Sequence, residues 1–380
     1  MKKTIFILLI CFAVLLPSVS YAQDSTSFKG QASAWMNLNT NNKLPLYLGG
    51  RYIPQLNSSF PLKNDHKIDF EASMNFYGSV GLNPFDSLNA SGKIKPYRLW
   101  ARYSTRQFEL RAGLQKLNFG SASILRPLMW FDEIDPRDPL KLTDGVWGVL
   151  GRYYFLNNAN IWLWALYGNK DPRGWEPAGT NNNYPEIGGR IQLPVPKGEV
   201  ALTYHHRVAD TRNLSASIPE YSEVPENRIG FDMKMDLVVG FWLEGSWVKK
   251  NKDLGMFTNQ EILNGGVDYT FSLGNGLYVI YEQLVAANDE KPFHFQNTTT
   301  FSLLSVSYPI GLSDNISAIV YYDWKNMNSY NFINWQKQFN NLSLYLMGYW
   351  NPKNYLIPAQ GEGENLFAGR GVQIMLVFNH

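Results

Sequence analysis

The sequence predicts an all-β fold, a transmembrane antiparallel up-and-down β-barrel of about 18 strands, with short turns at one end and long loops at the other. Three observations lead to this prediction: segments that alternate apolar and polar residues, connections that alternate in length, and an N-terminal segment typical of export. A period of two places successive side chains on opposite faces of a strand. Such two-faced strands suit a wall between lipid and water.

The N-terminus has the pattern of a signal peptide. Lys2 and Lys3 precede an apolar run over residues 4–16, and Ser20-Tyr21-Ala22 fits the small-residue rule for cleavage. We therefore expect a signal peptide at 1–22 and one outer-membrane barrel at 23–380. The alternative is an uncleaved anchor, although the apolar run is short for a helical span of roughly 20 residues.

Composition narrows the class of protein. Charged residues make up 17% of the chain and aromatic residues 15%, whereas ordinary soluble domains carry about 25% charged residues. The mean hydropathy of −0.26 is too low for a helical membrane protein. Without Lys2 and Lys3, 32 basic residues face 32 acidic ones, which gives no indication of nucleic-acid binding. Cys11 lies in the expected signal peptide, so the mature chain has no thiol for a disulfide or a metal.

The alternation is clearest in residues 67–80. Ile68, Phe70, Ala72, Met74 and Phe76 form the row expected to face lipid, and Asp69, Glu71 and Ser73 lie in the row expected to face water. The same pattern recurs along the chain, at 97–103, 108–115, 228–236, 263–272, 342–350 and 371–380.

The connections also alternate. Short turns are expected at 62–66, 104–107, 156–160, 194–198, 236–239, 273–276, 309–315 and 340–341, and polar loops at 82–92, 119–144, 169–184, 209–226, 250–259, 287–297 and 351–368. This pattern is typical of outer-membrane barrels, which have short periplasmic turns and long extracellular loops. It is not expected of the alternative all-β folds, a soluble sandwich or a propeller.

Two details of the strand count stay open. Residues 329–350 can be divided into one or two strands, so 16 strands is the alternative count. Barrels of this kind usually end in an aromatic residue, whereas this chain ends in His380, with Phe378 the nearest aromatic side chain.

One segment carries a more specific resemblance. Residues 110–146 contain Gly113, Gln115 and Gly120, followed by Asp135-Pro136-x-Asp138. In this the chain resembles Gram-negative outer-membrane porins, in particular substrate channels of the alginate-export type. The resemblance implies passive diffusion of small hydrophilic solutes, with outer-membrane lipid as surroundings and no cofactor. A homo-oligomer is a further option, and the alternative function is a non-conducting barrel partner in an export or assembly complex.

The polar faces of the strands carry opposite charges on different sides of the predicted wall. A basic side is expected from Arg98, Arg102, Arg111, Arg152, Arg190, Arg207 and Arg228, and an acidic side from Glu244, Asp268, Glu282 and Asp323. Such a wall puts a transverse field across the lumen. The alternative is that these charges only pair with each other between neighbouring strands.

The loop 119–144 is expected to fold inward and narrow the lumen. It carries Asp132, Glu133, Asp135 and Asp138, which we expect to face the arginines. It also carries Leu125, Leu128 and Trp130, which are too apolar for a solvated loop tip, and loops of this length are usually functional. The alternative is an extracellular lid.

Catalytic and metal chemistry have weaker support. His205 and His206 are adjacent on a predicted strand, so their side chains point to opposite faces and cannot share a metal ion. No Ser and His arrangement suggests an outer-membrane enzyme, which is the second alternative function. Calcium binding by Asp132, Asp135 and Asp138 is a further alternative.

Overall fold

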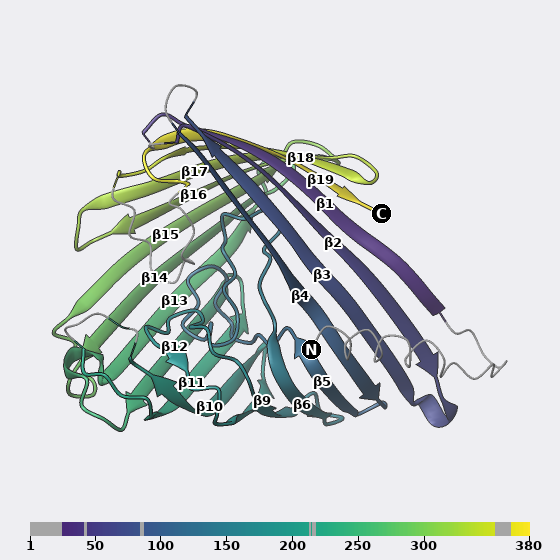
Figure 1. Ribbon diagram of the computed structural model, residues 1–380, viewed down its shortest axis with the longest axis vertical. Helices are drawn as coiled ribbons and strands as arrows, with labels where there is room; N and C mark the ends of the chain where they lie inside the picture. The colour runs from purple at the N-terminus through teal and green to yellow at the C-terminus, as the bar shows by residue number, and fades with distance from the viewer. Residues whose placement is uncertain (1–24, 42–43, 84–86, 213, 215–217, 354–365) are drawn as a thin grey trace.

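The computed structural model describes residues 25–41, 44–83, 87–212, 214, 218–353 and 366–380 (Figure 1). The expected signal peptide lies outside these residues. The strands are β1 (Ser25–Asn39), β2 (Leu46–Pro61), β3 (Lys67–Leu82), β4 (Leu88–Ser104), β5 (Phe108–Gln115), β6 (Val146–Tyr154), β7 (Asn160–Leu166), β8 (Gly179–Thr180), β9 (Glu186–Val195), β10 (Gly198–Asp210), β11 (Val224–Asp236), β12 (Gly240–Lys250), β13 (Asn259–Phe271), β14 (Leu277–Asp289), β15 (Thr298–Pro309), β16 (Asp314–Asp323), β17 (Asn328–Gln338), β18 (Leu342–Trp350) and β19 (Arg370–Asn379). Two 3-10 turns, η1 (Lys63–Asp65) and η2 (Gly255–Phe257), lie in connections.

The strands form a closed barrel. Each strand pairs antiparallel with its neighbours, and β1 closes the wall by pairing Gln31–Asn39 with Gly371–Asn379 of β19. Because β7 pairs directly with β9, the two-residue β8 is an addition beside β10. In the described part of the chain the wall therefore has 18 strands, which confirms the predicted fold and count. None of the described helical turns is long or apolar enough to cross a membrane.

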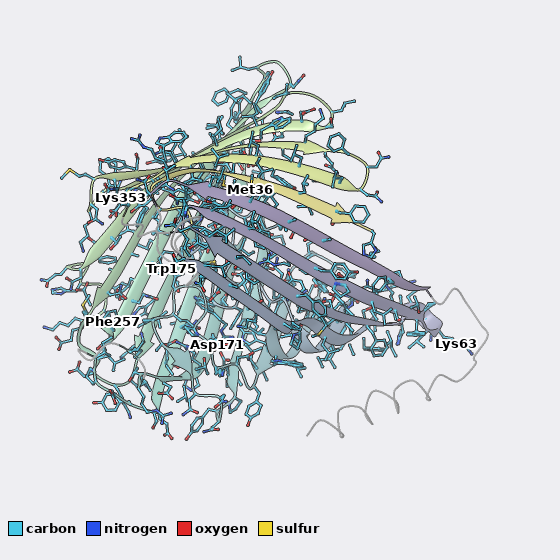
Figure 2. The ribbon with its side chains drawn as sticks, turned by 45° about the horizontal axis from the view of Figure 1, so that its top comes forward. Met36, Lys63, Asp171, Trp175, Phe257 and Lys353 are labelled. Carbon is cyan, nitrogen blue, oxygen red and sulfur yellow. The ribbon has the colours of Figure 1, made fainter. Side chains whose placement is uncertain are left out.

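The connections follow the expected pattern, with two refinements. All eight short turns fall at the predicted places, and residues 329–350 hold two strands, β17 and β18. The loop predicted at 82–92 is wrong in its bounds, because β3 runs to Leu82 and β4 begins at Leu88. Residues 88–95 alternate in type like the strand that follows, so they extend the pairing with β3. Figure 2 places Lys63, in a short turn, at the opposite end of the barrel from Lys353, in a long loop.

Apolar side chains cover the outside. On β3, Phe70 and Phe76 are 37% and 39% exposed, whereas Asp69 and Ser73 are 6% and 5% exposed. The predicted faces of this strand are therefore confirmed. The neighbouring strand β4 carries a bulge at Tyr97, because Ser73 is paired with Arg98 and Met74 with Pro96. An apolar exterior on a closed barrel is the architecture of outer-membrane proteins.

Three inward tryptophans lie over glycines of the neighbouring strand. Trp35 is paired with Gly49, Trp164 with Gly188 and Trp242 with Gly266. A β carbon built on any of these glycines would overlap the indole ring opposite. Each glycine thus provides the space in which a large ring lies flat on the inner wall, and the ring packs on the backbone left bare by the glycine.

The C-terminal residue is part of the seam. The backbone of His380 exchanges hydrogen bonds of 3.0 and 2.9 Å with Gly30. Its imidazole stacks on Tyr52, whose hydroxyl lies 3.1 Å from Nε2. The histidine therefore occupies the place where an aromatic residue was expected.

We predict that Gly266→Ala destabilises the barrel by about 1–3 kcal/mol, because the new methyl group must displace the buried Trp242 ring. Gly265→Ala is the matched control, since its β carbon would meet only Leu243, at 4.0 Å. Thermal unfolding followed by gel mobility measures both. Equal midpoints for the two variants would contradict the proposed role of the tryptophan–glycine pair.

Candidate functional site

Residues 116–145, which we call the inner loop, cross the inside of the barrel. This segment joins the neighbouring strands β5 and β6, yet it binds side chains of the distant strands β12 and β14. Figure 1 shows the corresponding trace within the wall of strands. The inner loop therefore defines the candidate site, together with the inward faces that it leaves uncovered.

Two wall carboxylates hold the inner loop by its backbone. Glu282 accepts hydrogen bonds from the amides of Ser123, Ile124 and Leu125 at 2.8, 3.2 and 2.6 Å. Glu244 accepts from Ala122 and Leu128 at 2.8 and 2.7 Å. Both glutamates are 0% exposed. A buried amide that loses its acceptor costs about 1–3 kcal/mol, so these five bonds fix the loop.

Packing adds to this attachment on both sides of the loop. Phe119, Trp130 and Phe131 form a buried cluster with Leu150 and Trp164 of the wall. Leu125 joins a second cluster on the inner face of β13–β18, and the Asn264 side-chain amide donates to its carbonyl. Trp130 Nε1 donates to Ser246 Oγ at 3.0 Å. The apolar residues of the loop are thus buried inside the barrel.

The acidic residues of the inner loop do not come together. Asp132 pairs with Arg126 of the loop at 2.9 Å, and Asp135 pairs with Arg137 at 2.7 Å. The described residues contain no group of three His, Cys, Asp or Glu side chains placed to hold a metal ion, so the alternative of a calcium site at Asp132, Asp135 and Asp138 has no support.

Two further ionisable groups of the inner loop are affected by burial. It raises the pKa of the Asp138 carboxyl above its ordinary value, and it lowers the pKa of the Lys116 ammonium. Glu133 is exposed, and its backbone amide donates to Thr143 Oγ1 at 2.9 Å. The loop therefore presents a mixed set of acidic groups rather than one acidic face.

The seven predicted arginines fall into three groups. Arg190, Arg207 and Arg228 are at most 4% exposed and are paired. Arg190 binds Asp232 at 2.5 and 2.9 Å. Arg207 and Arg228 both bind Glu226, and both also contact Glu176 from the loop 167–185, at 2.8 and 2.6 Å. For these three arginines, the geometry fits the alternative in which wall charges pair with charges of opposite sign.

Arg102, Arg111 and Arg152, which we call the arginine triad, surround one carboxylate. Their guanidinium groups lie 3.5, 2.9 and 3.6 Å from Glu109, and their side chains are 27%, 15% and 16% exposed. Arg102 also binds Asp69 at 2.8 Å. The triad therefore keeps an excess of positive charge on a part of the wall that the lumen reaches.

Tryptophan faces complete this part of the wall. The guanidinium of Arg111 lies 4.7 Å from the ring centre of Trp100, and that of Arg152 lies 3.9 Å from Trp162. Arg111 Nε and Arg152 Nε donate no hydrogen bond within the described structure. Arg98, the seventh arginine, forms no ion pair within the described residues. Its guanidinium donates a hydrogen bond to the Thr143 carbonyl at 2.8 Å. It thereby joins the wall to the inner loop.

The four acids of the predicted acidic side make different kinds of contact. Glu244 and Glu282 hold the inner loop, whereas Asp268 accepts a hydrogen bond from Tyr278 at 2.8 Å. Asp323 lies at the end of β16 and accepts the amides of Lys325 and Asn326 in the following turn. The sequence analysis missed Glu176, because its partners Arg207 and Arg228 come from other segments. It also missed Glu226, which falls at the end of the expected loop 209–226, although its spacing of two residues from Arg228 places both side chains on one face of β11.

Comparisons with known proteins show the fold. No family model matches the chain, and no curated protein matches it. Among solved structures, OccAB1 of Acinetobacter baumannii is 9% identical with a TM-score of 0.55, covering 94% of this chain and 95% of its own. OccK5 of Pseudomonas aeruginosa is 11% identical with a TM-score of 0.55, covering 93% and 98%.

A third solved structure is similar to the same extent. Wzi of Escherichia coli is 11% identical with a TM-score of 0.53, covering 92% of this chain and 84% of its own. Wzi is described as an outer-membrane, carbohydrate-binding β-barrel involved in group 1 capsule assembly. At these identities the likeness extends to the fold: this chain has the porin-like barrel architecture of outer-membrane proteins.

We predict that Glu282→Ala releases the apex of the inner loop. The change leaves three backbone amides without an acceptor, of which the Leu125 amide is buried and those of Ser123 and Ile124 are partly buried. Loss of the acceptor costs about 1–3 kcal/mol for the buried amide. Hydrogen exchange of residues 123–125 in the refolded barrel should speed up by about tenfold or more. Asp268→Ala is the control, because Asp268 contacts no inner-loop residue by a described hydrogen bond. Unchanged protection in the glutamate variant would show that packing alone holds the loop.

Proposed function

We propose that this chain is an outer-membrane porin that lets small hydrophilic solutes diffuse passively through the barrel. The arginine triad carries this proposal: three partly exposed guanidinium groups share Glu109 on the inner wall. A charge-lined lumen in a low-dielectric surround concentrates solutes of opposite charge. The N-terminal signal pattern supports export to the outer membrane.

The inner loop is proposed to narrow this pathway. Its attachment to Glu244 and Glu282 supports the proposal, because a loop fixed across the lumen reduces the free cross-section more reliably than one held at its ends alone. Asp132, Glu133, Asp135 and Asp138 are proposed to line the constriction. Among the wall residues, Glu244 and Glu282 are proposed to act by holding the loop. The partly exposed arginine triad is proposed to act by its charge.

A second candidate function has its own supporting observation. Inner-loop residues take part in three buried apolar clusters inside the barrel, so much of the interior is occupied by side chains. A filled barrel suits a non-conducting partner in an export or assembly complex. Wzi, which has a similar fold, is described as involved in group 1 capsule assembly.

An enzymatic role has less support. His205 is 0% exposed, and its ring nitrogens are bound by Glu186 and Trp164 at 3.2 Å each. His206 points to the other face and binds Asn227. We therefore propose a transport protein rather than an enzyme.

Deleting residues 126–138 tests the constriction. We expect the purified, refolded variant to show a larger single-channel conductance in a planar bilayer, because the deletion removes the part of the loop that follows its attachment to Glu282. An unchanged conductance with a stable open level would contradict the constriction. The absence of conductance from a correctly folded wild-type barrel would favour the assembly-partner function.

Neutralising two triad arginines tests the basic wall. In Arg111→Gln/Arg152→Gln we expect the chloride-over-potassium permeability ratio to fall by about two- to fivefold, since a unit charge a few ångströms away in water contributes about 1 kcal/mol. The reversal potential in a salt gradient gives the ratio. Arg106→Gln is the control, because Arg106 is 83% exposed in a short turn. Equal ratios in both variants would exclude the triad from ion selection.

A further inference from the structure

Two acidic residues are buried on the outer side of the wall, at its long-loop end. Glu261 of β13 alternates with Ile262, which packs inside, so the carboxyl of Glu261 faces outward. Asp289 ends β14 and lies directly opposite Asn259 of β13. Asn259, Glu261 and Asp289 therefore share one face of two neighbouring strands, within about 5–8 Å of each other at their β carbons.

These charges are not balanced by a base. Glu261 and Asp289 are 2% and 3% exposed, and neither forms an ion pair with any basic side chain in the described segments. Glu261 Oε2 and the amide oxygen of Asn259, which is itself 2% exposed, accept no hydrogen bond there. Buried carboxylates without a partner are costly, and so is an unpaired buried amide oxygen.

The remaining polar atoms of the three side chains fix the loop that follows β14. Glu261 Oε1 accepts the Phe293 amide at 3.0 Å, and Asp289 Oδ2 accepts the Gln296 amide at 3.0 Å. The side-chain amide of Asn259 donates to the Glu290 carbonyl at 2.8 Å. The loop 290–297 thereby covers the cluster and holds its oxygens in place.

We propose that Asn259, Glu261 and Asp289 bind one hard divalent cation of the calcium or magnesium type. Such ions take carboxylate and amide oxygens. The unpaired oxygens at this position are Glu261 Oε2 and Asn259 Oδ1. Asp289 adds a second carboxylate, whose two oxygens accept hydrogen bonds from Gln296 and Asn297 of the covering loop. A bound cation would neutralise both carboxylates, use the free oxygens of Glu261 and Asn259, and fasten the loop 290–297 to the wall. The site lies outside the lumen, so it is independent of the proposed channel function.

Trp247 provides a spectroscopic readout. It is paired with Glu261 across the β12–β13 ladder, and its ring lies 5.2 Å from that of Phe293 in the covering loop. An indole close to a calcium-type site can transfer excitation energy to bound Tb³⁺, an ion that takes similar oxygen ligands.

The experiment uses the full refolded barrel after treatment with a chelator. We expect Tb³⁺ to bind at about one equivalent with luminescence excited through tryptophan, and Ca²⁺ to displace it. Glu261→Gln and Asp289→Asn should each lose at least tenfold in Tb³⁺ affinity. Glu290→Gln, an exposed carboxylate in the same loop, is the matched control and should bind as the wild type does. Trp247→Phe should lose the luminescence and keep the binding.

Thermal unfolding gives a second measurement that does not need the variants. Millimolar Ca²⁺ should raise the midpoint of the chelated wild type by about 2–4 °C, because a ligand that binds only the folded state stabilises it. Sodium at equal ionic strength should give no such rise. Absence of both the Ca²⁺-dependent rise and the Tb³⁺ signal would overturn the site, as would equal Tb³⁺ affinity in Asp289→Asn and the wild type.

Discussion

The structure depends on one constraint: in the hydrocarbon core of a membrane, every backbone amide and carbonyl must be paired within the protein. The pairing of β1 with β19 satisfies it by removing the last free edge, and the terminal His380 continues the seam with two more backbone bonds. Once the wall is closed and its outer face meets lipid, the polar residues of the alternating pattern must lie on the inner face. The charged interior therefore follows from the closure.

The inward polar groups then meet a second requirement, which is that buried charge be compensated. Arg207 and Arg228 achieve this with Glu176 and Glu226, and Glu244 and Glu282 achieve it with the bare amides of the inner loop. The inner loop is thus held by two wall glutamates that form no ion pair within the described residues. The arginine triad is the exception, because three guanidinium groups there share Glu109 and keep some of their hydrogen-bonding capacity.

How far the sequence alone leads can be seen from particular residues. The period-two pattern in 67–80 identifies the strand and its faces, because burial on one side of a strand needs no knowledge of its partners. The same pattern in Leu88–Lys95 was obscured by Gly92 and Asn89, which have low strand propensity, so the start of β4 was misplaced. In the inner loop, Leu125 and Trp130 are conspicuous for their apolar character. The acceptor of the Leu125 amide is Glu282, and the acceptor of the Trp130 indole is Ser246. Both acceptors are more than a hundred residues away, and no local pattern connects them.

The unequal strand lengths have a consequence for the surrounding bilayer. Strands β1–β4 have 15 to 17 residues, whereas β5–β7 have 7 to 9. At a tilt of roughly 45°, the shorter strands rise only about 16–21 Å, less than the apolar band of about 25 Å in barrels of this type. The lipid beside β5–β7 must therefore thin, or the whole barrel must lean towards that side. Such a local mismatch gives a barrel a preferred orientation in the membrane and a preferred side for approaching neighbours.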